Sequence, residues 1–70
     1  MTEDIVNAKQ FNLLDDNGKL RAVLSTNKDE PELDLLDADG KNRVVLGMSK
    51  DGPGLTFFDP NSKVIWEAPQ

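Results

Sequence analysis

Aspartates recur in three short segments that could bind a cation: residues 15–18, 37–40 and 59–62, which read DDNG, DADG and DPNS. The EF-hand calcium loop has a related pattern, D-x-[DN]-x-[DN]-G-x₅-E, in which the first and twelfth residues are ligands. In both glycine-bearing segments those two positions hold leucines: Leu13 and Leu24 in one, Leu35 and Leu46 in the other. Since most of the charge that would attract a cation is missing, we expect hairpin turns here and predict no metal site.

Acid–base and nucleophilic chemistry is also disfavoured by the residue types. The chain has no cysteine and no histidine, which removes thiolates, most zinc sites and most nucleophile–base pairs. Carboxylates are paired only between close neighbours, such as Asp15 with Asp16 and Asp37 with Asp39. Nothing in the sequence supplies the apolar pocket that would raise the pKa of one partner and make an acid–base couple. We therefore predict that the chain is not an enzyme, with no catalytic residues and no cofactor.

Two arginines, Arg21 and Arg43, lie 22 residues apart at equivalent positions. The simplest interpretation is a cross-strand ion pair, in which each arginine lies diagonal to the aspartate that begins the preceding turn. Exposed pairs of this kind stabilise a sheet by only about 0.2–1 kcal/mol. The alternative is an anion or carboxylate pocket built from arginines of neighbouring hairpins or chains. Ile65 takes the third equivalent position, which argues against a ring of three arginines within one chain.

Most of the aromatic residues lie near the C-terminus: Phe57, Phe58 and Trp66. We expect them to form the bulkiest part of the hydrophobic core or of a contact between chains, because so small a domain needs its aromatic area for stability. The alternative is a ligand platform, since Trp and Phe on a surface also suit sugars, bases or peptides. A pocket lined by Trp66 with Phe58, or by the two arginines, would indicate a small-ligand-binding domain.

The charge of the chain argues against binding to nucleic acid. The formal net charge is −5, and six acidic residues lie in one segment without a basic residue among them: Asp29, Glu30, Glu32, Asp34, Asp37 and Asp39. Such a segment cannot neutralise phosphates. Its simplest interpretation is a solvated surface; the alternative is an acidic surface for a basic protein partner, or a nucleic-acid mimic. The longest aliphatic run is Val44 to Leu46 and the first ten residues lack a signal-peptide pattern, so we predict no membrane contact and a cytoplasmic location.

The elements that carry these residues form a repeat. Residues 11–32 align without a gap with residues 33–54, and half of the positions are identical. Residues 55–70 are a third, degenerate copy, with Ser62 in place of the turn glycine and Ile65 in place of the arginine. Atypical end units are expected where stacked repeats stop. We predict a flexible or lead-in segment at residues 1–7 and a single domain of three repeats at residues 8–70.

Each repeat has the pattern of a β-hairpin. We expect strands near residues 8–15, 19–26, 32–37, 41–49, 54–59 and 63–68, separated by segments that are too short for helices. In the turns the aspartate bonds back to the backbone and the glycine takes a left-handed conformation, which Ser62 can adopt only at a cost. The predicted fold class is all-β: an antiparallel meander of three tandem hairpins with about six strands, arranged as an oligomeric sheet, a prism or a small barrel.

The register of the hairpins decides which side chains share a face of the sheet. If Asp15 opposes Lys19, strand alternation places Leu14 opposite Leu20 and Leu13 opposite Arg21. Applied to all three repeats, this register gives two faces that are both largely apolar. A lone meander cannot cover both, and a chain of this length buries only about 60% of its unfolded surface. We therefore predict a homo-oligomer, either a dimer or a trimer.

The unit D-x-x-G-K-x-R-x-x-L, with the lead-in Ala8 to Phe11, resembles small uncharacterised bacterial proteins of tandem β-hairpins, some of which look like gene-cassette products. The resemblance covers residues 8 to 66 and implies no activity. We predict a self-associating structural or protein-interaction module. A small-ligand-binding β domain is the first alternative, and an acidic partner-binding or nucleic-acid-mimic protein is the second. The candidate interface or ligand surface is formed by five residues: Phe57, Phe58, Trp66, Arg21 and Arg43.

Overall fold

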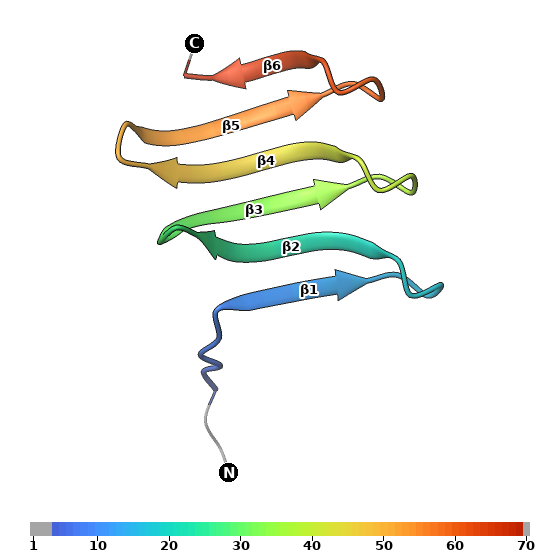
Figure 1. Cartoon of the computed structure of the whole chain (residues 1–70), viewed down its shortest axis with the longest axis vertical. Coiled ribbons are helices and arrows are strands. Elements are labelled where there is room, and N and C mark those ends of the chain that lie inside the picture. The colour runs from blue at the N-terminus through green and yellow to red at the C-terminus, as the bar shows by residue number, and fades with distance from the viewer. Residues whose placement is uncertain (1–3, 70) are drawn as a thin grey trace.

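The computed structural model describes residues 4–69, in which six β-strands and no helix occur. The strands are β1 (Gln10–Leu14), β2 (Leu20–Asn27), β3 (Glu30–Leu36), β4 (Asn42–Ser49), β5 (Gly52–Phe58) and β6 (Val64–Ala68). They form one antiparallel sheet in which each strand pairs with the next along the chain (Figure 1). The predicted all-β meander is confirmed. Residues 4–9 precede the sheet without regular structure, and residues 1–3 of the predicted lead-in lie outside the described part.

The sheet is a single open layer. The pairing runs from β1 to β6 and does not continue from β6 back to β1. The chain measures 45 × 35 × 19 Å along its principal axes. Its radius of gyration is 13.9 Å, whereas a compact domain of this length has about 11 Å. The small-barrel alternative is therefore wrong, because β1 and β6 remain as two unpaired edges of the described sheet. The open sheet, another of the predicted arrangements, is what the structure shows, and the prism stays a prediction.

The three turns that open with aspartate share one geometry. In the first, the Asp15 N–H donates to the Lys19 carbonyl oxygen at 2.9 Å, and the Gly18 N–H donates to the Asp15 carbonyl oxygen at 2.9 Å. The Asp15 carboxylate also accepts the backbone N–H groups of Asn17 and Lys19, at 2.9 and 3.0 Å. The turns at Asp37 and Asp59 repeat these bonds. The predicted turn chemistry is thus present in all three repeats.

Glycine occupies the left-handed position of the first two aspartate turns, and serine occupies it in the third. Gly18 and Gly40 have φ angles of 80° and 83°, and Ser62 has a φ angle of 68°. A side chain at such a φ angle crowds the backbone, so Ser62 adopts this conformation against its own preference. The left-handed φ angle of Ser62 is the source of the conformational free-energy cost that the sequence predicts for it.

The links between repeats are tighter than predicted. Asn27 pairs directly with Glu30, so that only Lys28 and Asp29 form the turn between β2 and β3, with φ angles of 53° and 68°. Two left-handed residues in a two-residue turn match the right-handed twist of the flanking strands. Ser49 likewise pairs with Gly52. As a result β3 and β5 begin two residues before their predicted starts.

A β-bulge in each aspartate hairpin changes the predicted register. Leu14 pairs with Leu20 as expected, but Leu13 pairs with Ala22, so Arg21 is an extra residue between two paired positions. The same step recurs in the second and third hairpins, where the extra residues are Arg43 and Ile65. The predicted pairing of Leu13 with Arg21 is therefore wrong. One extra residue shifts every later side chain of the strand to the other face.

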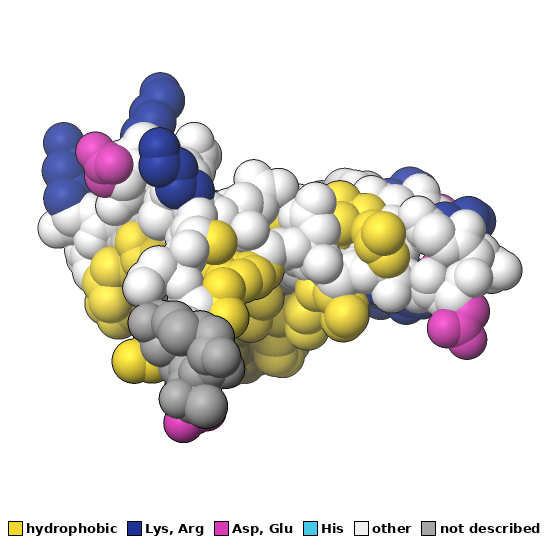
Figure 2. All heavy atoms as spheres, turned by 90° about the horizontal axis from the view of Figure 1, so that it is seen from below, with side chains coloured by type: hydrophobic (Ala, Val, Ile, Leu, Met, Phe, Trp, Pro, Cys, Tyr) yellow, Lys and Arg dark blue, Asp and Glu magenta, His cyan; other side chains and the backbone are white. Residues whose placement is uncertain are grey.

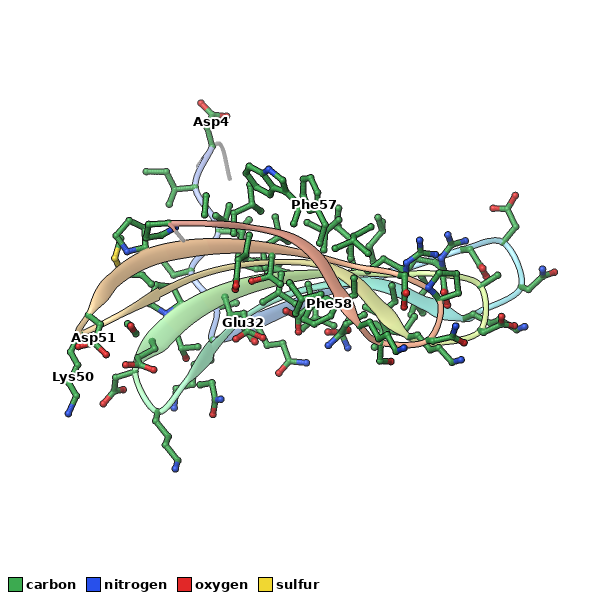
Figure 3. All side chains as sticks on the ribbon, turned by 90° about the horizontal axis from the view of Figure 1, so that it is seen from above. Asp4, Glu32, Lys50, Asp51, Phe57 and Phe58 are labelled. Atoms are coloured by element: carbon green, nitrogen blue, oxygen red, sulfur yellow. The ribbon has the colours of Figure 1, made fainter. Side chains whose placement is uncertain are left out.

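The shifted register separates the two faces of the sheet. One face, called here the apolar face, carries twelve apolar side chains in two rows that cross all six strands: Phe11, Leu24, Leu33, Leu46, Leu55 and Ala68 in one row, and Leu13, Ala22, Leu35, Val44, Phe57 and Trp66 in the other. The opposite, polar face carries Ser25, Glu32, Asp34, Thr56 and Glu67 in its middle. Figure 3 shows Phe57 on one side of the ribbon, with Glu32 and Phe58 on the other. The predicted allocation of residues to the two faces is wrong. The polar face is mixed, because it also carries apolar residues: Val23 and Val45 in its middle, and Leu14, Leu20, Leu36, Phe58 and Val64 toward the aspartate turns.

Candidate interaction surface

The apolar face results from the repeat itself. Each 22-residue unit contributes the same four positions, for example Leu33, Leu35, Val44 and Leu46 in the second unit. Because the strands pair in register, these four positions line up with their counterparts in the other two units. The recurrence of apolar residues at this spacing was visible in the sequence. Their gathering on one face was not, because it depends on the bulge.

No side chain of this face is fully buried by the chain itself. None of residues 4–69 is buried, and 13 large hydrophobic residues are between 37% and 74% exposed. Seven of them belong to the apolar face, including Leu24 at 48% and Leu46 at 46% exposed. Space-filling spheres in Figure 2 show the hydrophobic side chains gathered along one side of the molecule, with charged side chains mainly at its ends. The described residues thus form a sheet without a hydrophobic core.

The total accessible surface shows how much more area this open sheet exposes than a compact protein of the same mass. The chain exposes 5829 Å², whereas a compact protein of its mass exposes about 4,300 Å². The excess of about 1,500 Å² is spread over both faces and both edges of the open layer, so it is an upper bound on the area that one partner could cover. A stable interface buries roughly 800 Å² on each partner. The uncovered area is therefore large enough for a permanent protein–protein contact.

The three candidate aromatic residues are divided between the faces. Phe57 and Trp66 are directly paired on the apolar face, with ring centroids 5.0 Å apart and an angle of 30° between the rings. Phe58 lies on the opposite side and lines a hollow of about 280 Å³ with Lys41, Asn42, Val45 and Ser62. Trp66 and Phe58 therefore do not form a common ligand platform. The aromatic pair that the structure brings together belongs to the apolar face.

The two candidate arginines connect successive repeats. The Arg21 Nε donates to the Leu36 carbonyl oxygen at 3.0 Å, and the Arg43 Nε donates to the Phe58 carbonyl oxygen at 2.7 Å. In each case the acceptor is the last residue of the first strand of the next repeat. Each guanidinium also lies near the aspartate of its own turn, at 3.6 Å from Asp15 and 3.5 Å from Asp37. The arginines are engaged by the backbone and do not converge on a shared anion pocket.

The aspartates of the first two turns, Asp15 and Asp37, are held in the charged form by a lowered pKa. Backbone N–H groups, that of Lys19 first, lower the pKa of Asp15, and Arg21 adds a smaller effect of the same sign. The backbone N–H of Lys41 lowers the pKa of Asp37 in the same way, with help from Arg43. These carboxylates have their partners within the turn, so their role is to close the hairpins.

The polar face carries a row of acidic side chains on β3: Glu30, Glu32 and Asp34. A hollow of about 380 Å³ lies beside this row, over the paired Gly47 and Gly54. Sharing a hydrogen bond with the Asp34 carboxyl raises the pKa of Glu32, and burial and charge repulsion act in the same direction. One oxygen of Asp34, Oδ1, is enclosed without a hydrogen-bond partner. Of the predicted acidic segment, these three residues share one face, whereas Asp37 belongs to a turn.

Comparisons with protein-family models, with curated proteins and with solved structures found no match. The resemblance to bacterial tandem-hairpin proteins therefore stays a prediction.

Residues 4–69 contain no group of three or more histidine, cysteine, aspartate or glutamate side chains placed to hold a metal ion. None of those residues belongs to a helix long and apolar enough to cross a bilayer.

Proposed function

We propose that this protein is a self-associating structural module, in which the apolar face is the contact surface. One observation carries the proposal: a sheet with a continuous apolar face and no buried residue among those described. At roughly 25 cal/mol per Å² of apolar surface, an uncovered face of this size is a large unfavourable term for a lone chain in water. A single layer of strands gains its stability when a second layer covers the face.

Partner recognition through this face needs no reactive groups. The rows of Leu, Val, Phe and Trp offer shape and apolar area, and the paired Phe57 and Trp66 are the aromatic types that dominate protein contacts. The polar face and the turns carry the charged residues, which keep an assembled particle soluble. This distribution supports a structural or scaffolding role over a catalytic one.

The alternative predictions depend on less specific features. A ligand platform made of Trp66 and Phe58 would have to span both sides of the sheet. The acidic row of Glu30, Glu32 and Asp34 would attract cations and basic partners of many kinds without distinguishing among them. The apolar face therefore supports the proposed function better than either alternative feature.

Sedimentation equilibrium of the full chain at micromolar concentration tests the proposal. We expect a mass that is a multiple of the single chain, with no stable monomer at these concentrations. A folded monomer, recognised by a β-sheet circular dichroism spectrum and the mass of one chain, would contradict the proposal. The measurement needs no ligand or partner, because the second chain is the partner.

A further inference from the structure

Two kinds of surface on this chain are available to a second copy: the apolar face and the free strand edges β1 and β6. Edge pairing would place β6 of one copy beside β1 of the next and extend the meander. That contact is heterologous and leads to open-ended growth unless it closes into a ring. Face-to-face packing is isologous and stops at two chains. The two modes predict different particles and different contact residues.

We infer, on the basis of the proposed self-association, that two copies pack with their apolar faces together about a two-fold axis and leave the strand edges unpaired. This packing would remove at most the excess surface of about 1,500 Å² from water on each chain, or about 3,000 Å² for the pair. That total falls in the range of permanent homodimers, which bury roughly 2,000–5,000 Å². The product is a two-layer β-sandwich, with sheets about 10 Å apart.

The arginine contacts argue against edge pairing. Within the chain, Arg21 of β2 donates a hydrogen bond to the last carbonyl oxygen of β3. Arg43 of β4 donates in the same way to the last carbonyl oxygen of β5. The third equivalent position, which would fasten β6 to the β1 of another copy, holds Ile65 and has no such donor. The arginine hydrogen bond that joins consecutive repeats is thus absent at β6, where a second chain would continue the sheet.

The chain that follows β6 also limits pairing at this edge. Pro69 has the position that Ser25 and Gly47 occupy in the other two repeats, where the strand continues and pairs with the next repeat. Proline has no N–H group to donate to a neighbouring strand, and it is a common residue at protected sheet edges. Ile65 and Pro69 therefore both act on this edge, whereas the apolar-face residues Trp66 and Ala68 of the third repeat remain apolar.

The polar faces do not offer a rival contact between copies. Glu30, Glu32 and Asp34 lie on that face, and a two-fold axis would bring this row close to its own copy. Like charges that approach in an interface cost free energy, and desolvation adds to that cost. The net charge of −5 strengthens the same repulsion. Among residues 4–69, the apolar face is the surface that combines self-complementary chemistry with a continuous apolar area.

Two lysine substitutions on one strand test the inference. Leu24 and Ser25 are neighbours on β2 and face opposite sides of the sheet. Leu24→Lys places a charge in the middle of the proposed contact in both copies, so we expect association to weaken by about a hundredfold or more. Ser25→Lys adds the same charge to the polar face beside Glu32, and we expect a change of less than about fivefold. Sedimentation equilibrium gives both dissociation constants.

Hydrogen exchange on the unmodified protein gives a second test, which does not depend on the folding of any variant. Face-to-face packing leaves the outward-pointing amides of β1 and β6 in water, so we expect them to exchange fast while the central strands β3 and β4 are protected. An oligomer with protected amides along both edge strands, or with Leu24→Lys as tight as Ser25→Lys, would overturn the face-to-face mode and leave self-association standing. A folded monomer would overturn both.

Discussion

The two faces of this sheet are built from the same strands but have opposite chemistry. On the apolar face, two rows of apolar side chains cross all six strands without a charged residue. On the polar face, the middle of the sheet carries serine, threonine and carboxylates around Val23 and Val45, and a row of apolar residues lies toward the aspartate turns: Leu14, Leu20, Leu36, Phe58 and Val64. The division depends on one extra residue in each hairpin, because without the bulge the alternation would mix the two sets. The bulge thus determines that one face is continuously apolar and the other is mixed.

The first prediction concerns removal of a bulge. Deletion of Arg43 leaves Leu36 opposite Asn42 and Leu35 opposite Val44 with no extra residue between them, so the hairpin becomes a regular ladder and Val44 stays on the apolar face. We expect the free energy of unfolding to fall by about 1–2 kcal/mol, because the hydrogen bond from Arg43 to the Phe58 carbonyl oxygen is lost. Denaturant titration at a fixed protein concentration measures the change.

Arg43→Ala is the matched control for that deletion. It keeps the number of residues and removes the side-chain bond to the Phe58 carbonyl oxygen and the contact with Asp37. We expect a loss of about 1–2 kcal/mol, the usual effect of a hydrogen bond from a charged group. Equal losses for the deletion and for the alanine variant would mean that the side chain, and not the extra residue, is what matters.

A second prediction compares neighbouring residues of β6. Trp66 is on the apolar face against Phe57, whereas Ile65 is the extra residue of the bulge and is 61% exposed. We expect Trp66→Ala to destabilise the assembled protein by about 2–4 kcal/mol, because it removes a large aromatic contact from the proposed interface. Ile65→Ala should cost less than about 1 kcal/mol. Similar values for the two variants would contradict the assignment of the faces.

The third prediction concerns the turn that sets the register of the last hairpin. Ser62 has a φ angle of 68°, where glycine stands in the other two turns. Ser62→Gly relieves a strain of about 1–2 kcal/mol and adds about 0.4–1 kcal/mol of unfolded-state entropy, so we expect a net gain of about 0.5 kcal/mol. Thermal unfolding measures it, with Gly40→Ser as the reverse change. A loss of stability in Ser62→Gly would show that the serine side chain has a favourable contact of its own.

The smallest expected effect is on the polar face and depends on pH. The pKa of Glu32 is raised above its ordinary value of 4.5 by the neighbouring Asp34. Stability from this group is fully present below the unfolded pKa and is lost as the pH rises through the folded pKa. Glu32→Gln should therefore stabilise the protein at pH 7, by about 0.5 kcal/mol or less after solvent screening, and have no effect below about pH 4. A gain that persists at low pH would point to a cause other than the carboxyl pair.

The turn aspartates give the opposite pH dependence, which serves as an internal reference. The pKa values of Asp15 and Asp37 are lowered, so their contribution is present above the unfolded pKa and is lost as the pH falls through the folded pKa. Unfolding followed from pH 7 to pH 2 should show this loss in the Glu32→Gln variant as well, because the turns are unchanged.

Much of the fold could be predicted from the 22-residue repeat and its turn residues. Aspartate, glycine and lysine at fixed spacing defined the hairpins, and the strand bounds differ from the prediction by at most two residues. The bulge at Arg21 could not be predicted, because its sequence is compatible with either register and the choice depends on which apolar residues share a face. Missing this one extra residue in the register led to the prediction of two largely apolar faces, whereas the sheet has one continuously apolar face and one mixed face. It also separated Trp66 from Phe58, which the sequence had suggested as partners.

The fluorescence of Trp66 tests the central claim most directly. It is the one tryptophan of the chain, lies on the apolar face and is 44% exposed in the single chain. If a second copy covers that face, the emission should shift to shorter wavelength and acrylamide quenching should fall over the same concentration range in which sedimentation shows assembly. Unchanged emission and quenching of Trp66 in an assembled particle would contradict the account.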